Sequence, residues 1–187
     1  MSVEEYLAFE RRSEGRHEYL DGEIFAMTGA SRYHNRLAVN LAGILYPQLR
    51  GGPCELYIAD MRVRVAATGL YTYPDLAVVC GEARFDDAHL DTLLNPTLIF
   101  EILSPSTEAA DRGRKFAHYR KVESLREVLL IVQDRVAVEH YSRQPPPPEG
   151  AWHLLEATGL DDRLSLPSIG CELPLADLYE RVFRETT

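Results

Sequence analysis

The sequence has few cysteines, no long apolar run and little positive charge. Its three cysteines, Cys54, Cys80 and Cys171, are odd in number and widely spaced, so they predict neither a disulfide framework nor a metal site. This cysteine usage favours a reducing cytoplasm. No run of 18 or more apolar residues occurs, so we expect no transmembrane helix and no membrane partner. The acidic start, with Glu4 and Glu5, lacks the features of a signal peptide.

Positive charge is scarce, because 20 Lys and Arg residues stand against 29 Asp and Glu residues, for a net charge of −9. Lys and Arg drive binding to phosphates, so this composition argues against a surface that coats nucleic acid broadly. A local basic groove remains compatible with it. Five basic residues follow one another closely, at Arg112, Arg114, Lys115, Arg120 and Lys121. Such clusters are more often solvated faces than binding sites, so this signal is weak.

The hydrophobic content of 45% over 187 residues suits one well-buried domain, residues 1–187. Strand and helix patterns are mixed along the chain, which predicts a mixed α/β fold. We expect strands at 17–20, 23–27, 55–59, 61–65, 73–80, 97–103, 128–132, 136–141 and 152–156, the last two forming an antiparallel hairpin. We expect helices after Ser2, after Ser31, over 108–122 and after Pro174. The length of the Asp-rich segment 81–96 predicts a mobile loop or a short helix.

Two carboxylates lie in otherwise apolar strand patterns. Glu101 is the one charged residue of 97–103, and Asp75 stands near the start of 73–80. An ionised carboxylate in a buried strand is costly unless a cation compensates it. Two of them on neighbouring strands would suit a magnesium-class cation, which prefers oxygen ligands and keeps several waters. The alternative is that Asp75 caps a turn and Glu101 pairs with an arginine.

The helix expected over 108–122 begins next to the end of the Glu101 strand. Asp111, Lys115 and Tyr119 share one of its faces, because they are spaced four residues apart. Lys115 could thus reach the space between the two carboxylates. The alternative is an ordinary Asp111–Lys115 surface pair. His34 falls in the first turn of the helix after Ser31, where a structural role is the commoner interpretation and a catalytic role the rarer one.

Several of these motifs, in this order, resemble the Uma2 family of bacterial proteins. This family is grouped with restriction endonucleases in the PD-(D/E)XK nuclease superfamily. The motifs are Pro74-Asp75, then Phe100 to Thr107, then Asp111 to Tyr119. The likeness runs nearly end to end, and further matching stretches are Glu18 to Ile24, Arg32 to Asn35 and Gly159 to Cys171.

The resemblance implies a restriction endonuclease-like core, a mixed sheet with flanking helices, and a metal site on adjacent central strands. Asp75 takes the place of the first Asp of the motif and Glu101 that of its (D/E) residue, with the carbonyl of Ile102 as a further metal ligand. The superfamily places its lysine two residues after this Glu, where the present chain has Leu103. Lys115 is the candidate for a lysine that has migrated to the following helix.

The leading hypothesis is therefore an endonuclease that hydrolyses DNA with Mg²⁺ or Mn²⁺, in which Asp75, Glu101 and Lys115 carry the chemistry. A homodimer is compatible with the resemblance, because many nucleases of this superfamily pair subunits to cut both strands, but the sequence identifies no interface. Residues expected to support the site are Glu18, Glu23, His34, Asp111 and Tyr119.

Two other functions use the same fold. Leu103 and the acidic surface favour a non-catalytic binding or regulatory module that has kept the nuclease scaffold. A metal-dependent hydrolase of RNA or of a small phosphoester would use the same residues as the DNA nuclease, so the sequence does not separate these two activities.

Overall fold

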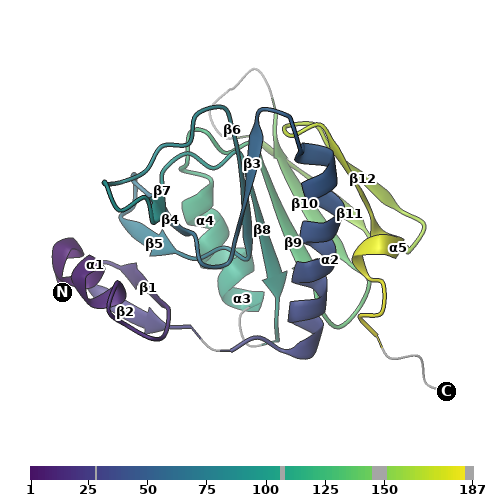
Figure 1. Ribbon diagram of the computed structural model, residues 1–187. Helices are drawn as coiled ribbons and strands as arrows, with labels where there is room; N and C mark the ends of the chain where they lie inside the picture. Colours follow the sequence, from purple (N-terminus) through teal and green to yellow (C-terminus); the bar gives the residue numbers. More distant parts are fainter. Residues whose placement is uncertain (28, 106–107, 145–150, 184–187) are drawn as a thin grey trace.

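A computed structural model describes residues 1–27, 29–105, 108–144 and 151–183 (Figure 1). The larger of its sheets has six strands in the order β11-β10-β9-β8-β6-β3. These strands are β3 (Cys54–Ile58), β6 (Leu76–Cys80), β8 (Leu98–Leu103), β9 (Glu127–Val132), β10 (Val138–Arg143) and β11 (Trp152–Ala157). β8 and β9 are parallel and the other pairs are antiparallel, so the sheet is mixed. Both central strands are buried along their whole length, as their continuous apolar runs predict.

The two faces of β8 enter two different cores. Phe100 and Ile102 pack in the core that contains helix α2 (Arg32–Leu49), whereas Ile99 and Leu103 pack in the core on the opposite face. Side chains alternate along a strand, so Glu101 points to the same face as Leu103. Figure 1 shows α2 across one face of the sheet and the short helices α3 and α4 across the other.

Helix α2 has the start and the apolar face that its sequence predicts. Ser31 is its N-cap, and its side chain accepts a hydrogen bond from the backbone N–H of His34. Four leucines spaced four residues apart are buried against the sheet, at positions 37, 41, 45 and 49. The start of the helix is thereby fixed beside the ends of the central strands, which places His34 there.

The crossover between the parallel strands β8 and β9 is helical but irregular. It consists of α3 (Glu108–Ala110), the π-helical turn η1 (Asp111–Lys115) and α4 (Phe116–Tyr119). The predicted regular helix over 108–122 is thus shorter and contains a π turn, a feature that is frequent at functional sites. The predicted caps Ser106 and Thr107 lie outside the described residues.

A second sheet has the order β2-β1-β5-β4-β7. Its strands are β1 (His17–Leu20), β2 (Glu23–Ala26), β4 (Arg62–Val65), β5 (Leu70–Thr72) and β7 (Thr92–Leu93), and helix α1 (Val3–Glu10) precedes them. The predicted β1–β2 turn is confirmed, since Asp21 and Gly22 both have positive φ values of 51° and 88°. Strand β5 was not predicted separately. The short helix considered for 81–96 is wrong, because this segment contains β7, which pairs in parallel with β4.

The C-terminal part forms the predicted β10–β11 hairpin and a second one, β12 (Arg163–Leu166) with β13 (Cys171–Pro174). The connection 145–150 lies outside the described residues. The helix expected after Pro174 is the short α5 (Leu175–Leu178), whose two leucines are buried in the α2 core.

The expectation of unpaired cysteines is wrong for two of the three. Cys54 and Cys80 are directly opposite each other on β3 and β6, with Cα atoms 4.0 Å apart, and form a disulfide. The pairing depends on strand register, which the sequence spacing of 26 residues does not reveal. Cys171 is free and buried. The cysteines therefore no longer favour a reducing compartment. No helix in the described part of the chain has the length and hydropathy that a membrane crossing needs.

Candidate active site

Asp75 is held from two sides at the start of β6. Its Oδ2 accepts a hydrogen bond of 2.6 Å from the backbone N–H of Ile102 on β8, and its Oδ1 lies 2.8 Å from Nε2 of His34. The antiparallel pairing of Leu76 with Phe100 brings the two strands into this register. Nδ1 of His34 is buried and has no hydrogen-bond partner among the described residues. Asp75 is thus fixed beside β8.

Glu101 lies in the middle of β8 and is only 3% exposed. Its Oε1 accepts a hydrogen bond of 2.5 Å from the hydroxyl of Tyr119 and lies 3.5 Å from Nζ of Lys115. Lys115 also lies 3.3 Å from Oδ1 of Asp111 and 2.8 Å from Oε1 of Glu18 on β1. The crossover helix, the central strand and the second sheet therefore meet at this ammonium group.

Burial and neighbouring charges set the protonation of this cluster. Burial raises the pKa of Glu101 well above its usual range, Asp111 and Asp75 add to the rise, and the Lys115 charge opposes it. For Lys115, burial lowers the pKa, but its anionic neighbours, Glu101 first, outweigh burial and raise it. Lys115 is therefore charged. Lys115 thus lies among the carboxyl groups of Glu101, Asp111 and Glu18, and the raised pKa of Glu101 indicates that the lysine compensates its charge only in part, so a further cation would favour its ionised form.

The donor set suits a magnesium-class ion better than a zinc-class ion. Among the described residues, no three His, Cys, Asp or Glu side chains come together in a group that could bind a metal by themselves. Mg²⁺ is commonly bound by only one or two carboxylates and keeps several waters. Asp75 and Glu101 supply such oxygen ligands. A cation bound between them would favour the ionised form of Glu101, whose pKa is raised by burial and by the neighbouring carboxylates. The two residues therefore fit Mg²⁺ or Mn²⁺.

Most of the residues singled out from the sequence come together, and one does not. Asp111 and Lys115 form no ordinary surface pair, because both side chains are largely buried. Glu101 pairs with a lysine, so the arginine alternative is wrong. Glu23 is exposed on β2, and its side chain forms no hydrogen bond or ion pair with the described residues. Leu103, at the usual lysine position, is 2% exposed within the apolar core.

Sequence reasoning missed Thr72 at the end of β5. Its hydroxyl donates a 2.5 Å hydrogen bond to Oε1 of Glu18, the same oxygen that Lys115 contacts. The three-residue strand β5 has no pattern that separates it from the turn before it. Only the pairing of β1 with β5, through Tyr19 and Tyr71, brings Thr72 close to Glu18.

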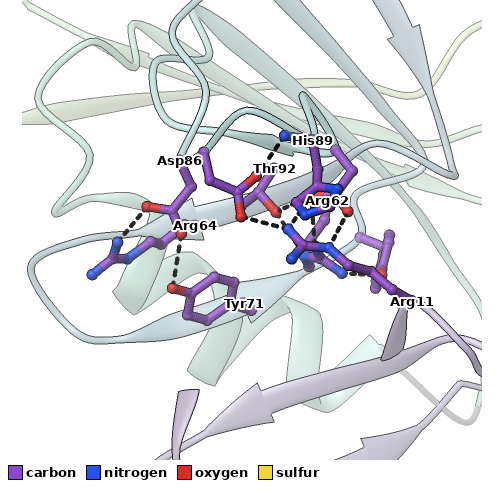
Figure 2. Close-up of polar contacts among 10 residues, drawn as sticks. Arg11, Arg62, Arg64, Tyr71, Asp86, His89 and Thr92 are labelled. Atoms are coloured by element: carbon purple, nitrogen blue, oxygen red, sulfur yellow. Dashed lines mark hydrogen bonds and ion pairs between the residues drawn. The ribbon is translucent and has the colours of Figure 1, made fainter. Parts of the chain in front are cut away.

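A second polar network anchors the sheet that carries Glu18 (Figure 2). The buried Arg62 on β4 donates hydrogen bonds of 2.9 Å to Thr92, Tyr73 and Asp91. Arg11, after α1, donates to Asp91 and Asp87 in the 81–96 segment. This network joins α1, β4 and β7 to one another, and so it helps to hold β1 in place.

The network also perturbs the acidity of Asp91. The hydrogen bond from Arg11 lowers the pKa of Asp91 to about 2, burial opposes the shift, and the Arg62 charge adds to it. Because the folded-state pKa lies below the unfolded value of about 3.9, Asp91 stabilises the fold above that value. This contribution is lost as the pH falls through about 2.

Arg62→Met is expected to lower the free energy of unfolding by about 3 kcal/mol, because it removes three hydrogen bonds from a buried cation while Met keeps the apolar stem packed. Arg64→Met is the matched control on the same strand. Its ion pair with Asp86 is about one-third exposed on the arginine side, so we expect a loss of at most about 1 kcal/mol. Urea denaturation measures both values, and equal losses would contradict the anchoring role of Arg62.

Comparison with known proteins agrees with this architecture. A family model, Uma2, described as "putative restriction endonuclease", matches residues 3–176. Two uncharacterised proteins of Synechocystis are similar: slr1290 is 37% identical over 96% of this chain and 91% of its own, and sll1609 is 36% identical over 85% and 88%.

A crystal structure from Anabaena variabilis, described as a "putative nuclease belonging to DUF820", aligns with a TM-score of 0.73. The aligned region covers 98% of this chain and 99% of the Anabaena chain. The two sequences are 18% identical in this region, so the match shows a shared fold. The expected mixed α/β, restriction endonuclease-like fold is confirmed. The chain belongs to the Uma2 family.

Proposed function

We propose that the protein is a Mg²⁺- or Mn²⁺-dependent endonuclease that hydrolyses DNA phosphodiester bonds. The observation that carries this proposal is the position of Lys115, 3.5 Å from Glu101. A lysine from the crossover helix stands at the central carboxylate, although the usual lysine position holds the buried Leu103. The family description and the fold of the Anabaena structure support the same class of activity.

Asp75, Glu101 and the carbonyl of Ile102 would hold the cation. Such a cation polarises a phosphoryl oxygen and lowers the pKa of water. The contacts of the two carboxylates support this role. The Ile102 N–H and His34 fix Asp75. The Tyr119 hydroxyl and Lys115 both contact Oε1 of Glu101, which leaves its Oε2 for the metal.

Lys115 would act on the phosphate during attack by water. Its ammonium group is buried and charged, and its three donor hydrogens face Glu18, Asp111 and Glu101, so a substrate oxygen would take the place of one of these contacts. A positive charge fixed in this place stabilises the negative charge that develops on the phosphoryl group. Glu18 would orient Lys115 and the attacking water, and Thr72 would hold Glu18. Cleavage would leave a 3′-hydroxyl and a 5′-phosphate.

The experiment that tests this function is incubation of the protein with supercoiled plasmid DNA and with end-labelled RNA, each with Mg²⁺, with Mn²⁺ or with EDTA. We expect nicked DNA with either metal and none with EDTA. Asp75→Asn serves as the matched inactive variant, because it keeps the size of the side chain and removes its charge. Intact DNA under every condition would favour the non-catalytic module, and cleavage of RNA alone would change the substrate class.

We also propose a homodimer in the cytoplasm, where DNA is available. The Cys54–Cys80 pair would be open to reduction in that compartment. Analytical ultracentrifugation would measure the subunit number.

A further inference from the structure

A cavity of about 600 Å³ opens at the end of the six-stranded sheet that is remote from the candidate active site. The strand ends that line it include Thr97 before β8, Arg126 before β9, Arg143 at the end of β10 and Cys80 at the end of β6. This is the upper end of the sheet in Figure 1, where β8 begins. At a rise of about 3.3 Å per residue, Glu101 lies about 13 Å further along β8 than Thr97. The cavity is therefore separate from the metal-site carboxylates.

Two guanidinium groups give this cavity its charge. Neither Arg126 nor Arg143 forms an ion pair with an acidic side chain among the described residues. Arg143 donates to the backbone carbonyls of Arg120 and Val122, at 2.9 and 3.1 Å, which fixes its head. Its Nε is buried without a hydrogen-bond partner among the described residues. The Arg143 guanidinium also lies over the ring of Trp152, with Cζ 5.0 Å from the ring centroid, so its positive charge is held at the cavity without a carboxylate partner among the described residues.

The electrostatics of Arg143 agree with an unbalanced positive charge. Burial lowers the pKa of Arg143, the Arg126 charge lowers it further, and the Glu123 charge opposes the shift. An anion bound between the two guanidinium groups would remove this repulsion.

Among the described residues that line the cavity, the one carboxylate is Glu127, and it is hydrogen-bonded from behind. Oε1 of Glu127 lies 2.6 Å from Nε2 of His140, and its Oε2 accepts hydrogen bonds from both the backbone N–H and the hydroxyl of Ser168. Glu127 is 1% exposed, and both of its carboxylate oxygens already have partners in the protein. The rest of the wall includes hydroxyl groups. Thr97 accepts a bond from the Cys80 N–H, which leaves its own hydroxyl hydrogen for a ligand.

We propose that this cavity binds a phosphomonoester of about the size of a mononucleotide. Arginine and phosphate form strong charge-assisted hydrogen bonds, and two positive charges match a phosphate dianion. The volume lies within the range of about 300–1,000 Å³ that is typical of small-molecule sites and exceeds what inorganic phosphate fills. The phosphate belongs either to a free nucleotide or to the end of a nucleic acid strand. The proposal stands independently of the nuclease activity.

Calorimetry in EDTA with adenosine 5′-monophosphate, adenosine, inorganic phosphate, succinate and a 5′-phosphorylated oligonucleotide tests this site. We expect the monophosphate to bind, adenosine not to bind, and Arg126→Gln to weaken binding at least tenfold. Arg12→Gln is the matched control, because Arg12 is also exposed and also contacts one carbonyl of its own segment. Its affinity should equal that of the wild type. Arg143→Lys keeps the charge but loses the planar group that contacts two carbonyls and the Trp152 ring, so the charge is no longer fixed and binding should also weaken.

The outcomes separate the ligand sources. Tighter binding of the monophosphate indicates a free nucleotide, and tighter binding of the oligonucleotide indicates a strand end. The proposal is overturned if the wild type binds no phosphate compound at millimolar concentration, or if succinate binds as tightly as the monophosphate. It is also overturned if folded Arg126→Gln, checked by thermal unfolding, keeps the wild-type affinity.

Discussion

Glu101→Gln is expected to reduce metal-dependent DNA cleavage by about 10²–10³-fold, as the loss of one fixed electrostatic group does in other enzymes, while the protein stays folded. Gln has the size of Glu and still accepts the hydrogen bond from Tyr119. It has no charge with which to bind the cation. Burial already raises the pKa of Glu101, so its ionised form is costly in the folded protein and its removal should not lower stability.

Plasmid nicking rates, measured beside thermal unfolding curves, test this expectation. Glu55→Gln is the control, because Glu55 is exposed on the edge strand β3 and pairs only with Tyr57 among the described side chains. Its nicking rate should equal that of the wild type. A Glu101→Gln protein that cleaves within threefold of the wild-type rate would show that Glu101 does not bind the essential metal.

Lys115→Gln is expected to reduce cleavage about as much as Glu101→Gln does. Unlike Glu101→Gln, it is also expected to destabilise the fold. Lys115 is the one ammonium group within 4 Å of Glu18, Glu101 and Asp111 among the described residues. Its removal leaves buried carboxylates without compensation, a change that costs about 3–5 kcal/mol in other proteins. A Lys115→Gln/Glu101→Gln double variant should recover part of this stability but no activity, because one of the uncompensated charges is then absent.

The same variant should show a marked pH dependence of stability. The folded-state pKa of Glu101 is raised already in the wild type, where Lys115 opposes the rise, so loss of Lys115 raises it further. A carboxyl group with a raised folded-state pKa stabilises the fold below its unfolded pKa of about 4.3 and loses that contribution as the pH rises. Urea denaturation of Lys115→Gln between pH 4 and 8 should therefore show stability that decreases with pH more steeply than in the wild type. A parallel pH profile would contradict the charge coupling.

The sequence predicted the parts of this site that lie within single elements. Glu101 was found because a charged residue interrupts an apolar run, and Lys115 because it shares a helix face with Asp111 and Tyr119. The contact between Lys115 and Glu101 was predicted because the helix follows the strand directly. Lys115 keeps this contact although the helix contains a π turn.

The parts that depend on register between distant segments could not be predicted. The disulfide between Cys54 and Cys80, the bond from Thr72 to Glu18 and the burial of Arg62 all require knowledge of which strands pair and in which alignment. Short strands such as β5 and β7 carry too few residues for a periodic pattern. The segment 81–96 was predicted to be a loop or a short helix from its length and its Asp residues. Its conformation depends instead on hydrogen bonds from Arg11, after α1, and Arg62 on β4.

Calorimetric titration of Mn²⁺ into the wild type and into an Asp75→Ala/Glu101→Ala variant tests the central claim most directly. The claim is that these two carboxylates, held by Ile102, His34, Tyr119 and Lys115, form a divalent metal site. We predict saturable Mn²⁺ binding by the wild type and none by the double variant at the same concentrations. Equal binding by both proteins, or no binding by either in the presence of a DNA duplex, would contradict the assignment.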